Sequence, residues 1–255
     1  MSTSFPPKIT GEFTQQTKSE IETINSLFDA TQYILKSTGH QWNGHLVATL
    51  RRQTISRILW FNSLYEKIID VPGVICEFGV QWGATTALLC NLRGMHEPFN
   101  HSRKIIGFDT FSGFESVDPK DGGFNADGDY ATSSDHLKKL QALLLDHEQL
   151  SPISHIKKHE LVVGDACETF PACLEDNSSS IIALAILDFD IYKFAKVVLE
   201  RIIERLTKGS VLVFDELNCT HFPGETIALL ETLGINNLKL KRNPHQPYCT
   251  YAVWG

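Results

Sequence analysis

Five short apolar runs constrain the fold of this chain more than any other feature of its sequence. They lie at 74–80, 104–111, 161–164, 181–187 and 211–214, and stretches with helical spacing separate them. Continuous apolar strands that alternate with helices are typical of a parallel sheet covered on both faces. Two later strands, at 238–241 and 250–254, are predicted to form an antiparallel hairpin at one edge. The pattern predicts an α/β fold with a doubly wound, mostly parallel sheet of seven strands.

Helices are predicted between the strands, and a separate helical region precedes them. The interstrand helices are expected at 85–92, 134–146, 192–206 and 224–233, with a further one around 168–174. Across 14–70, apolar residues recur three and four positions apart, which indicates amphipathic helices. We therefore expect a flexible N-terminus at 1–13, a helical extension or lid at 14–70 and the main domain at 71–255.

The charge and the hydropathy pattern exclude several classes of protein. Among the 255 residues, 23 basic and 30 acidic side chains give a net charge of −7, which does not attract nucleic acid or anionic membranes. No apolar run approaches the roughly 20 residues that span a bilayer, and the N-terminus lacks the pattern of a signal peptide. The six cysteines lie mostly in apolar runs without a CxxC motif, which favours reduced thiols. We expect a cytoplasmic protein with no nucleic-acid or membrane partner, whose helices at 45–69 could form a homodimer interface.

A glycine-containing turn follows the first predicted strand. It has the pattern E-x-G-x-x-x-G, with Glu77, Gly79 and Gly83 at the defined positions. A dinucleotide site needs a further glycine in the middle of the turn, and here Gln81 and Trp82 crowd it. A pyrophosphate is therefore disfavoured, and the charge of Glu77 favours an uncharged or cationic ligand. The alternative is an ordinary strand–helix turn that binds nothing.

Carboxylates also follow the second and third predicted strands. Asp109 is placed to accept hydrogen bonds from both hydroxyls of a ribose, and Asp165 from the exocyclic amine of an adenine. Each has a simpler alternative, because an aspartate at these positions can cap the helix or turn that follows.

Four acids follow the fourth and fifth predicted strands, which could be neighbours in a parallel sheet. Asp188 and Asp190 end one strand, and Asp215 and Glu216 end the other. Converging carboxylates repel one another unless a cation neutralises them, and Mg²⁺ is the hard divalent cation that prefers oxygen ligands. Asp188, Asp215 and Glu216 are the first candidates as ligands, with Asp190 and Asn218 in reserve. Helix capping or pairing with nearby Lys and Arg side chains is the alternative.

Several residues could take the proton from a metal-bound hydroxyl. Asp188 or Asp190 could serve as the base, and His221, on the loop after the fifth strand, is the other candidate. His136 and His155 are less favoured. A solvated loop histidine without a role is the simpler interpretation of His221.

The long loop at 112–134 is rich in Gly and Asp, which suggests a mobile lid, and an insertion unrelated to substrate is the alternative. Four aromatic residues could line an apolar wall of the pocket, although such residues more often belong to the core. They are Trp82, Phe111, Phe114 and Tyr192.

The order of these motifs resembles a known enzyme family. The motifs are EFGVQWG at 77–83, GFDTFSGF at 107–114, LDFDIY at 187–192, FDELN at 214–218 and FPGET at 222–226. Over residues 40–255 the chain is similar to class I S-adenosylmethionine-dependent methyltransferases and, within them, to the macrocin O-methyltransferase (TylF/MycF-like) family. One departure is Glu216, because family members often carry Asp-Asp where this chain has Asp-Glu.

The resemblance implies a Rossmann-like methyltransferase fold and an enzyme that transfers a methyl group from S-adenosylmethionine to a hydroxyl of a sugar or other small natural product. It implies Mg²⁺ at Asp188, Asp215 and Glu216, with an acidic residue as the base. The implied donor site consists of Glu77, Phe78, Gly79, Gly83, Asp109, Thr110, Asp165, Ala166 and Asp188. The alternatives are an NAD(P)-binding oxidoreductase and a non-catalytic nucleoside-binding module.

Overall fold

The computed structural model describes residues 17–255, and these form two compact units, 17–59 and 60–255. The division between the units falls within helix α3 (Arg52–Ile68). The predicted flexible start at 1–13 lies outside the described residues.

The larger unit is built on a seven-stranded sheet in the order β3-β2-β1-β4-β5-β7-β6. Its strands are β1 (Val74–Phe78), β2 (Ile105–Asp109), β3 (His159–Val163), β4 (Ile182–Leu187), β5 (Leu206–Phe214), β6 (Lys241–Asn243) and β7 (Gln246–Val253). The first five run parallel, and β7 pairs antiparallel with both β5 and β6. The predicted doubly wound, mostly parallel sheet with an antiparallel C-terminal hairpin is confirmed.

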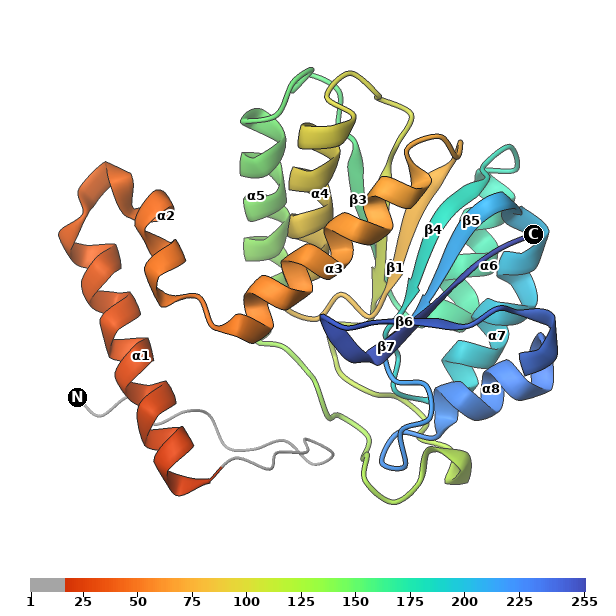
Figure 1. The fold of residues 1–255 in the computed structure, drawn as a ribbon. Coiled ribbons are helices and arrows are strands. Elements are labelled where there is room, and N and C mark those ends of the chain that lie inside the picture. The colour runs from red at the N-terminus through yellow and green to blue at the C-terminus, as the bar shows by residue number, and fades with distance from the viewer. Residues whose placement is uncertain (1–16) are drawn as a thin grey trace. The chain divides into compact units, whose positions relative to one another are not determined.

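Helices cover both faces of this sheet, as Figure 1 shows. One face packs against α6 (Ala166–Asp176), α7 (Tyr192–Ile202) and α8 (Gly224–Thr232), and the other against α3, α4 (Ala84–His96) and α5 (His136–Gln149). Successive residues of β1 serve opposite faces: Cys76 and Phe78 belong to the first cluster, and Ile75 to the second. Burying a large apolar side chain of this kind contributes roughly 1.5–3 kcal/mol, which explains why the strands are continuously apolar.

The strand order places the polar strand ends together. The order reverses between β1 and β4, and ligands of open α/β sheets bind outside the carboxyl ends of the strands at such a point. Leu187 of β4 pairs with Phe214 of β5, so that Asp188 and Asp215, the next residues, start side by side. The expectation that the fourth and fifth strands are neighbours is confirmed.

Two C-terminal boundaries differ from the sequence prediction. The strand predicted at 238–241 is wrong over its first three residues, because a short 3-10 helix, η5 (Ile235–Asn237), leads into β6 at Lys241. The fifth strand starts at Leu206, five residues before the predicted 211, because its first four residues are only partly buried or exposed and so carry no apolar run.

The smaller unit is helical, as predicted. Its longest element is α1 (Lys18–Ser37), whose N-terminus has a capping box formed by Thr17 and Glu20. Three short elements follow, η1 (Gly39–Gln41), α2 (Trp42–His45) and η2 (Leu46–Thr49). Across 17–255, no helix combines the length and the apolar character needed to cross a membrane.

Candidate active site

Backbone hydrogen bonds tie the ends of the parallel strands into one row. The Gly79 N–H donates to the carbonyl of Phe108 at 3.0 Å, the Asp188 N–H to that of Phe78 at 2.9 Å, and the Asp215 N–H to that of Leu187 at 3.1 Å. The turn after β1 and the acids after β4 and β5 therefore lie at neighbouring positions of the carboxyl edge.

Gly79 is required by the close approach of β4. Its φ is +93°, and a Cβ there would lie 1.9 Å from the carbonyl oxygen of Asp188. Gly83, with φ +81°, is required by the packing of α5, because a Cβ there would lie 2.2 Å from Leu140 Cδ1. Both glycines set the shape of the turn before any ligand is considered.

Glu77 and Phe78 are buried at the end of β1. The Glu77 carboxylate accepts a hydrogen bond from the Thr86 hydroxyl of α4. Phe78 packs in the core, with its ring centroid 4.9 Å from that of Phe108 and 5.0 Å from that of Phe170. The charge of Glu77 thus faces the start of α4, next to the glycine turn.

The Asp109 carboxylate organises the turns after β1 and β2. Its Oδ2 accepts the N–H groups of Val80 and Gln81, both at 2.7 Å, and its Oδ1 accepts that of Phe111 at 2.6 Å. A carboxylate has about four acceptor positions, so one remains for a ligand. The adjacent Thr110 hydroxyl donates to the carbonyl of Gly113 at 2.9 Å, within the following turn.

Asp165 caps α6, as its simpler interpretation proposed. Its Oδ1 accepts the Cys167 N–H at 2.6 Å, and Ala166 begins the helix. Its Oδ2 lies 3.8 Å from Lys193 Nζ of α7. The structure thus shows Asp165 as a helix cap, and its interaction with the amine of an adenine stays a prediction.

The acids after β4 and β5 lie close enough together that their charges raise the pKa of two of them, Asp190 and Glu216. Burial, followed by the fields of Glu216 and Asp215, raises the pKa of Asp190 well above its usual range. Burial, followed by the fields of Asp215 and Asp188, raises the pKa of Glu216 to about 7. These carboxyls therefore hold protons more tightly than free carboxyls do.

Sequence reasoning missed Glu225, the second residue of α8. It is buried, and its Oε2 accepts the N–H of Glu216 at 3.0 Å. Burial raises the pKa of Glu225 well above its usual range, and the fields of Asp215, Asp188 and Asp190 raise it further. In the sequence it looks like an ordinary acid in the first turn of a helix, where such residues are common.

Asp121 is the second missed acid, and it corrects the interpretation of the loop at 112–134. It is fully buried at the end of η3 (Pro119–Asp121), and its side chain accepts the N–H groups of Tyr192 at 2.5 Å and Asp118 at 2.7 Å. Asn125 and Asp129 of the same loop are also buried. The Asp residues that suggested mobility include buried anchors that fix the loop to the start of α7.

The donor set at these strand ends fits a hard cation in its chemistry. Glu216 Oε2 and Glu225 Oε1 are buried and have no hydrogen-bond partner. Carboxylate oxygens are the ligands that Mg²⁺ prefers. As the side chains stand across 17–255, no three His, Cys, Asp or Glu residues are arranged to hold one ion. For the reserve ligand Asn218, the structure shows a hydrogen bond from its backbone N–H to the Thr226 hydroxyl at 2.9 Å.

The three histidine candidates lie in different places. His221 is half-buried on the loop after β5, and its ring lies 4.9 Å from that of Phe124 of the 112–134 loop. His136 contacts the glycine turn, with Nε2 3.1 Å from the carbonyl oxygen of Gln81. His155 is exposed before the start of β3, at the amino edge of the sheet, and so lies away from the strand-end acids.

The four aromatic residues do not form one wall. Trp82 is 55% exposed, so it is not a core residue, and its ring lies 4.6 Å from that of His136. Phe111 packs against the same face as α3–α5, whereas Phe114 packs against the opposite face. The hydroxyl of Tyr192 donates to Glu231 Oε2 of α8 at 2.5 Å. Trp82 is the member of this set whose exposed ring borders the glycine turn.

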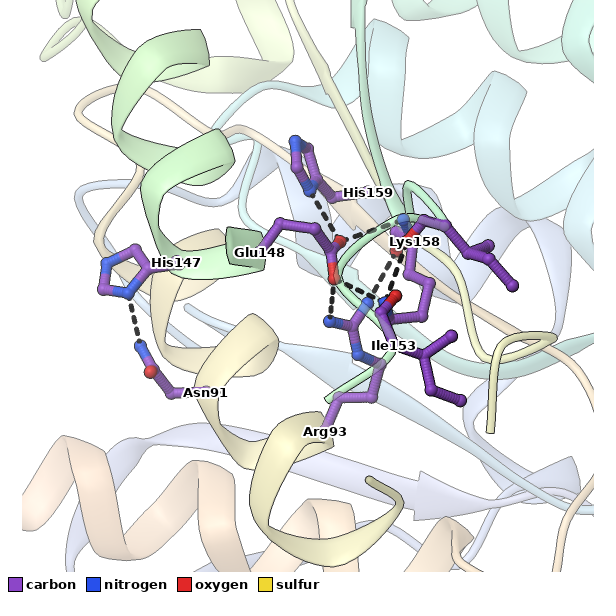
Figure 2. A network of polar contacts seen from close by, with 8 residues as sticks. Asn91, Arg93, His147, Glu148, Ile153, Lys158 and His159 are labelled. Carbon is purple, nitrogen blue, oxygen red and sulfur yellow. Dashed lines mark hydrogen bonds and ion pairs between the residues drawn. The ribbon is translucent and has the colours of Figure 1, made fainter. Parts of the chain in front are cut away.

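A second group of buried charges lies at the amino edge of the sheet, and Figure 2 shows it centred on Glu148. Glu148 Oε1 lies 2.9 Å from a guanidinium nitrogen of Arg93 and 2.6 Å from Lys158 Nζ, and its Oε2 lies 3.1 Å from His159 Nδ1. Although burial opposes it, hydrogen bonds from Lys158 and the charge of Arg93 lower the pKa of Glu148 to about 2. This carboxylate is fully compensated.

Known structures show what this chain resembles, although no protein-family profile and no curated protein matches its sequence. The crystal structure of CalS11, a calicheamicin methyltransferase, is 36% identical over 100% of both chains, with a TM-score of 0.88. The apo structure of CalS11, described as a TDP-rhamnose 3′-O-methyltransferase of calicheamicin biosynthesis, is 35% identical over 95% of this chain and 97% of the other, with a TM-score of 0.83. The O-methyltransferase NovP has the same fold at 16% identity, covering 78% of this chain and 79% of its own, with a TM-score of 0.58.

Proposed function

The chain belongs to the class I S-adenosylmethionine-dependent O-methyltransferases, and we propose that it methylates a sugar hydroxyl at the carboxyl edge of its sheet. The family membership makes it a methyltransferase enzyme that uses S-adenosylmethionine. The observation that carries the proposal is its 36% identity to CalS11 over the whole chain, together with the row of acids where the strand order reverses. The alternatives of an NAD(P)-dependent oxidoreductase and a non-catalytic module are set aside on the same ground.

We propose that the donor binds over the ends of β1, β2 and β3. Glu77 and Gly79 would border its sulfonium end, because a buried carboxylate favours a cation and the turn leaves its backbone close to the edge. Asp109, with its one remaining acceptor position, would bind the ribose, and Asp165 would face the adenine. Phe78, Gly83, Thr110 and Ala166 belong to this site as the residues that shape it.

We propose that Asp188, Asp215 and Glu216 hold Mg²⁺. The support is the raised pKa of Glu216 beside Asp215 and Asp188 and the unpartnered Oε2 of Glu216, which a dication would satisfy. When bound, such an ion lowers the pKa of the acceptor hydroxyl. The backbone of Asp188 is held in position by the hydrogen bond from its N–H to the carbonyl of Phe78, at the point where β1 and β4 separate.

We propose Asp188 as the base and His221 as the second candidate. The base takes the hydroxyl proton while the oxygen attacks the donor methyl in line, and the carbon–sulfur bond breaks to release S-adenosylhomocysteine. The support for His221 is its place on the loop after β5, where the ring of Phe124 packs against its ring. The aromatic contacts and the anchored 112–134 loop would limit the access of water.

The acceptor is proposed to be a sugar because CalS11 is described as acting on TDP-rhamnose. A nucleotide-linked deoxysugar and the sugar of a larger natural product share the hydroxyl that is methylated. The cytoplasmic location, the absence of nucleic-acid and membrane partners and the homodimer stay predictions from the sequence.

The proposal is tested by ligand binding followed by turnover. In calorimetry, S-adenosylhomocysteine is expected to bind the purified enzyme, whereas NADH is not. With labelled S-adenosylmethionine and Mg²⁺, TDP-rhamnose and related nucleotide sugars are expected to accept the label. Binding of NADH without binding of S-adenosylhomocysteine contradicts the donor assignment, and transfer only to non-sugar hydroxyls contradicts the acceptor class.

A further inference from the structure

Glu225 is a buried acid, and only one of its two carboxyl oxygens has a hydrogen-bond partner. Its side chain lies under the start of α8 and is 1% exposed. Oε2 accepts the Glu216 N–H at 3.0 Å, while Oε1 has no hydrogen-bond partner. No cation pairs with Glu225 among the described residues, so its position leaves a buried oxygen unsatisfied.

The surroundings of Glu225 are acidic on the side of the strand ends. Asp215, Asp188 and Asp190 all act on it electrostatically, in that order of strength. They follow the ends of β4 and β5, and the hydrogen bond from the Glu216 N–H to Oε2 ties Glu225 of α8 to the same strand end. The carboxyl of Glu225 is therefore close to the proposed ligands and in contact with the backbone of one of them.

The start of α8 is held rigidly, which fixes Glu225 in this position. A Cβ on Gly224 would lie 2.1 Å from Asp121 Oδ1 and 2.6 Å from the Tyr192 nitrogen. The 112–134 loop, the start of α7 and the start of α8 are therefore tightly packed at Gly224, the residue before Glu225. Such packing places a side chain reproducibly, as a metal site requires.

A purely structural role does not explain the acid. A glutamine would accept the same hydrogen bond from Glu216, so this hydrogen bond alone does not require an acid at position 225. A buried acid with an unsatisfied oxygen destabilises the fold unless the oxygen finds a partner. Because no side chain of the described residues supplies that partner here, a bound water or ion would have to.

We propose that Glu225 is an outer member of the divalent-cation site, where Oε1 binds a water ligand of the ion and Oε2 positions Glu216. This inference rests on the proposed function, because it presumes a cation at Asp188, Asp215 and Glu216. Mg²⁺ keeps several water ligands in proteins, and the residues that orient such ligands contribute to its affinity.

The experiment measures Mn²⁺ binding to the full-length enzyme by electron paramagnetic resonance, together with the melting temperature in EDTA. Glu225→Gln is expected to weaken Mn²⁺ binding about 10–100-fold and to raise the melting temperature without metal. The matched control is Glu231→Gln on the same helix, where Glu231 pairs with Lys120 and Lys196 at the surface and should not change Mn²⁺ affinity. Glu225→Asp keeps the charge and should bind Mn²⁺ better than Glu225→Gln.

The outcomes separate this inference from the proposed function. Equal Mn²⁺ affinity of wild type and Glu225→Gln overturns the role of Glu225, as does a lowered melting temperature with unchanged affinity. A wild-type enzyme that binds no Mn²⁺ but still transfers methyl groups overturns the cation itself. If Glu225→Gln does not fold, Glu225→Asp decides: affinity equal to wild type with a lowered melting temperature marks a structural residue, and weakened affinity supports the proposal.

Discussion

The two edges of the sheet bury carboxylates in opposite ways. At the amino edge, Glu148 meets Arg93 and Lys158, and its pKa falls to about 2 (Figure 2). At the carboxyl edge, the pKa of Glu216 rises to about 7 beside other acids. Buried charges that are paired inside the protein serve the fold, whereas buried charges left without a partner are typical of binding and catalytic sites. We therefore expect the carboxyl edge, rather than the amino edge, to bind the ligand.

The largest effect on stability is expected at the compensated edge. Glu148→Ala leaves Arg93 and Lys158 buried without a counter-charge, which should lower the free energy of unfolding by about 3–5 kcal/mol. Urea unfolding followed by circular dichroism measures it. Glu148→Gln, which keeps a polar group, should lose less than Glu148→Ala. A loss below 1 kcal/mol in both variants would show that the network does not hold the fold.

The largest effect on activity is expected at the other edge. Asp188→Asn should lower the rate of methyl transfer by about 10²–10⁴-fold, because it removes the proposed base and a ligand. Its stability without metal should stay equal or rise, since one repelling charge is lost. The assay is single-turnover transfer, with S-adenosylhomocysteine binding as the control for folding. Wild-type rates in this variant would contradict the assignment of Asp188.

The pH dependence of stability should separate the edges by sign. Glu148 has a folded pKa below its usual value, so its contribution of about 3 kcal/mol is present above pH 4.5 and is lost as the pH falls toward 2. Glu216 has a folded pKa of about 7, so the folded state gains stability as the pH falls from about 7 toward 4.5.

Thermal melts of three proteins in EDTA measure this difference. The melting temperature of Glu216→Gln relative to that of wild type should rise from pH 5 to pH 8. Between wild type and Glu148→Gln, the advantage of wild type should shrink below pH 4.5. Added Mg²⁺ should remove the first trend and leave the second. Parallel curves for all three proteins would mean that neither carboxylate titrates as described.

The smallest effect is expected at the surface pair of Lys120 and Glu231, which lie 2.6 Å apart. Exposed ion pairs contribute little because water and salt screen them. Lys120→Met should therefore change the melting temperature less than Glu148→Ala or Glu148→Gln does. A loss comparable to that of Glu148→Ala would show that this contact, and not the buried Asp121, holds the 112–134 loop in place.

The sequence predicted the sheet because its signal is local. Strands β1, β2 and β4 are short apolar runs, and a residue at the end of each run is polar, so that both the strands and the row of acids at their ends were visible. The neighbouring positions of Asp188 and Asp215 followed from the parallel order. The first residues of β5 were missed because they are only partly buried.

The sequence could not predict the partners of buried charges, because these come together from distant positions. Glu148 and Lys158 are ten residues apart, but Arg93 is 55 residues from Glu148, and no pattern links them. In the sequence, Asp121 looks like a residue of a mobile loop. In the structure it is buried, and it accepts a hydrogen bond from the Tyr192 nitrogen, 71 residues further along the chain. The same holds for Glu225, whose burial depends on the packing of α8 against the strand ends.

The most direct test of the account is the anomalous difference map of a crystal grown with S-adenosylhomocysteine and Mn²⁺. We predict a Mn²⁺ peak in contact with carboxylate oxygens of Asp188, Asp215 and Glu216, and the nucleoside over the ends of β1 and β2 beside Asp109. A nucleoside bound elsewhere, or a carboxyl edge without the metal in a crystal that diffracts well and contains the nucleoside, would contradict the claim that these acids form the working site.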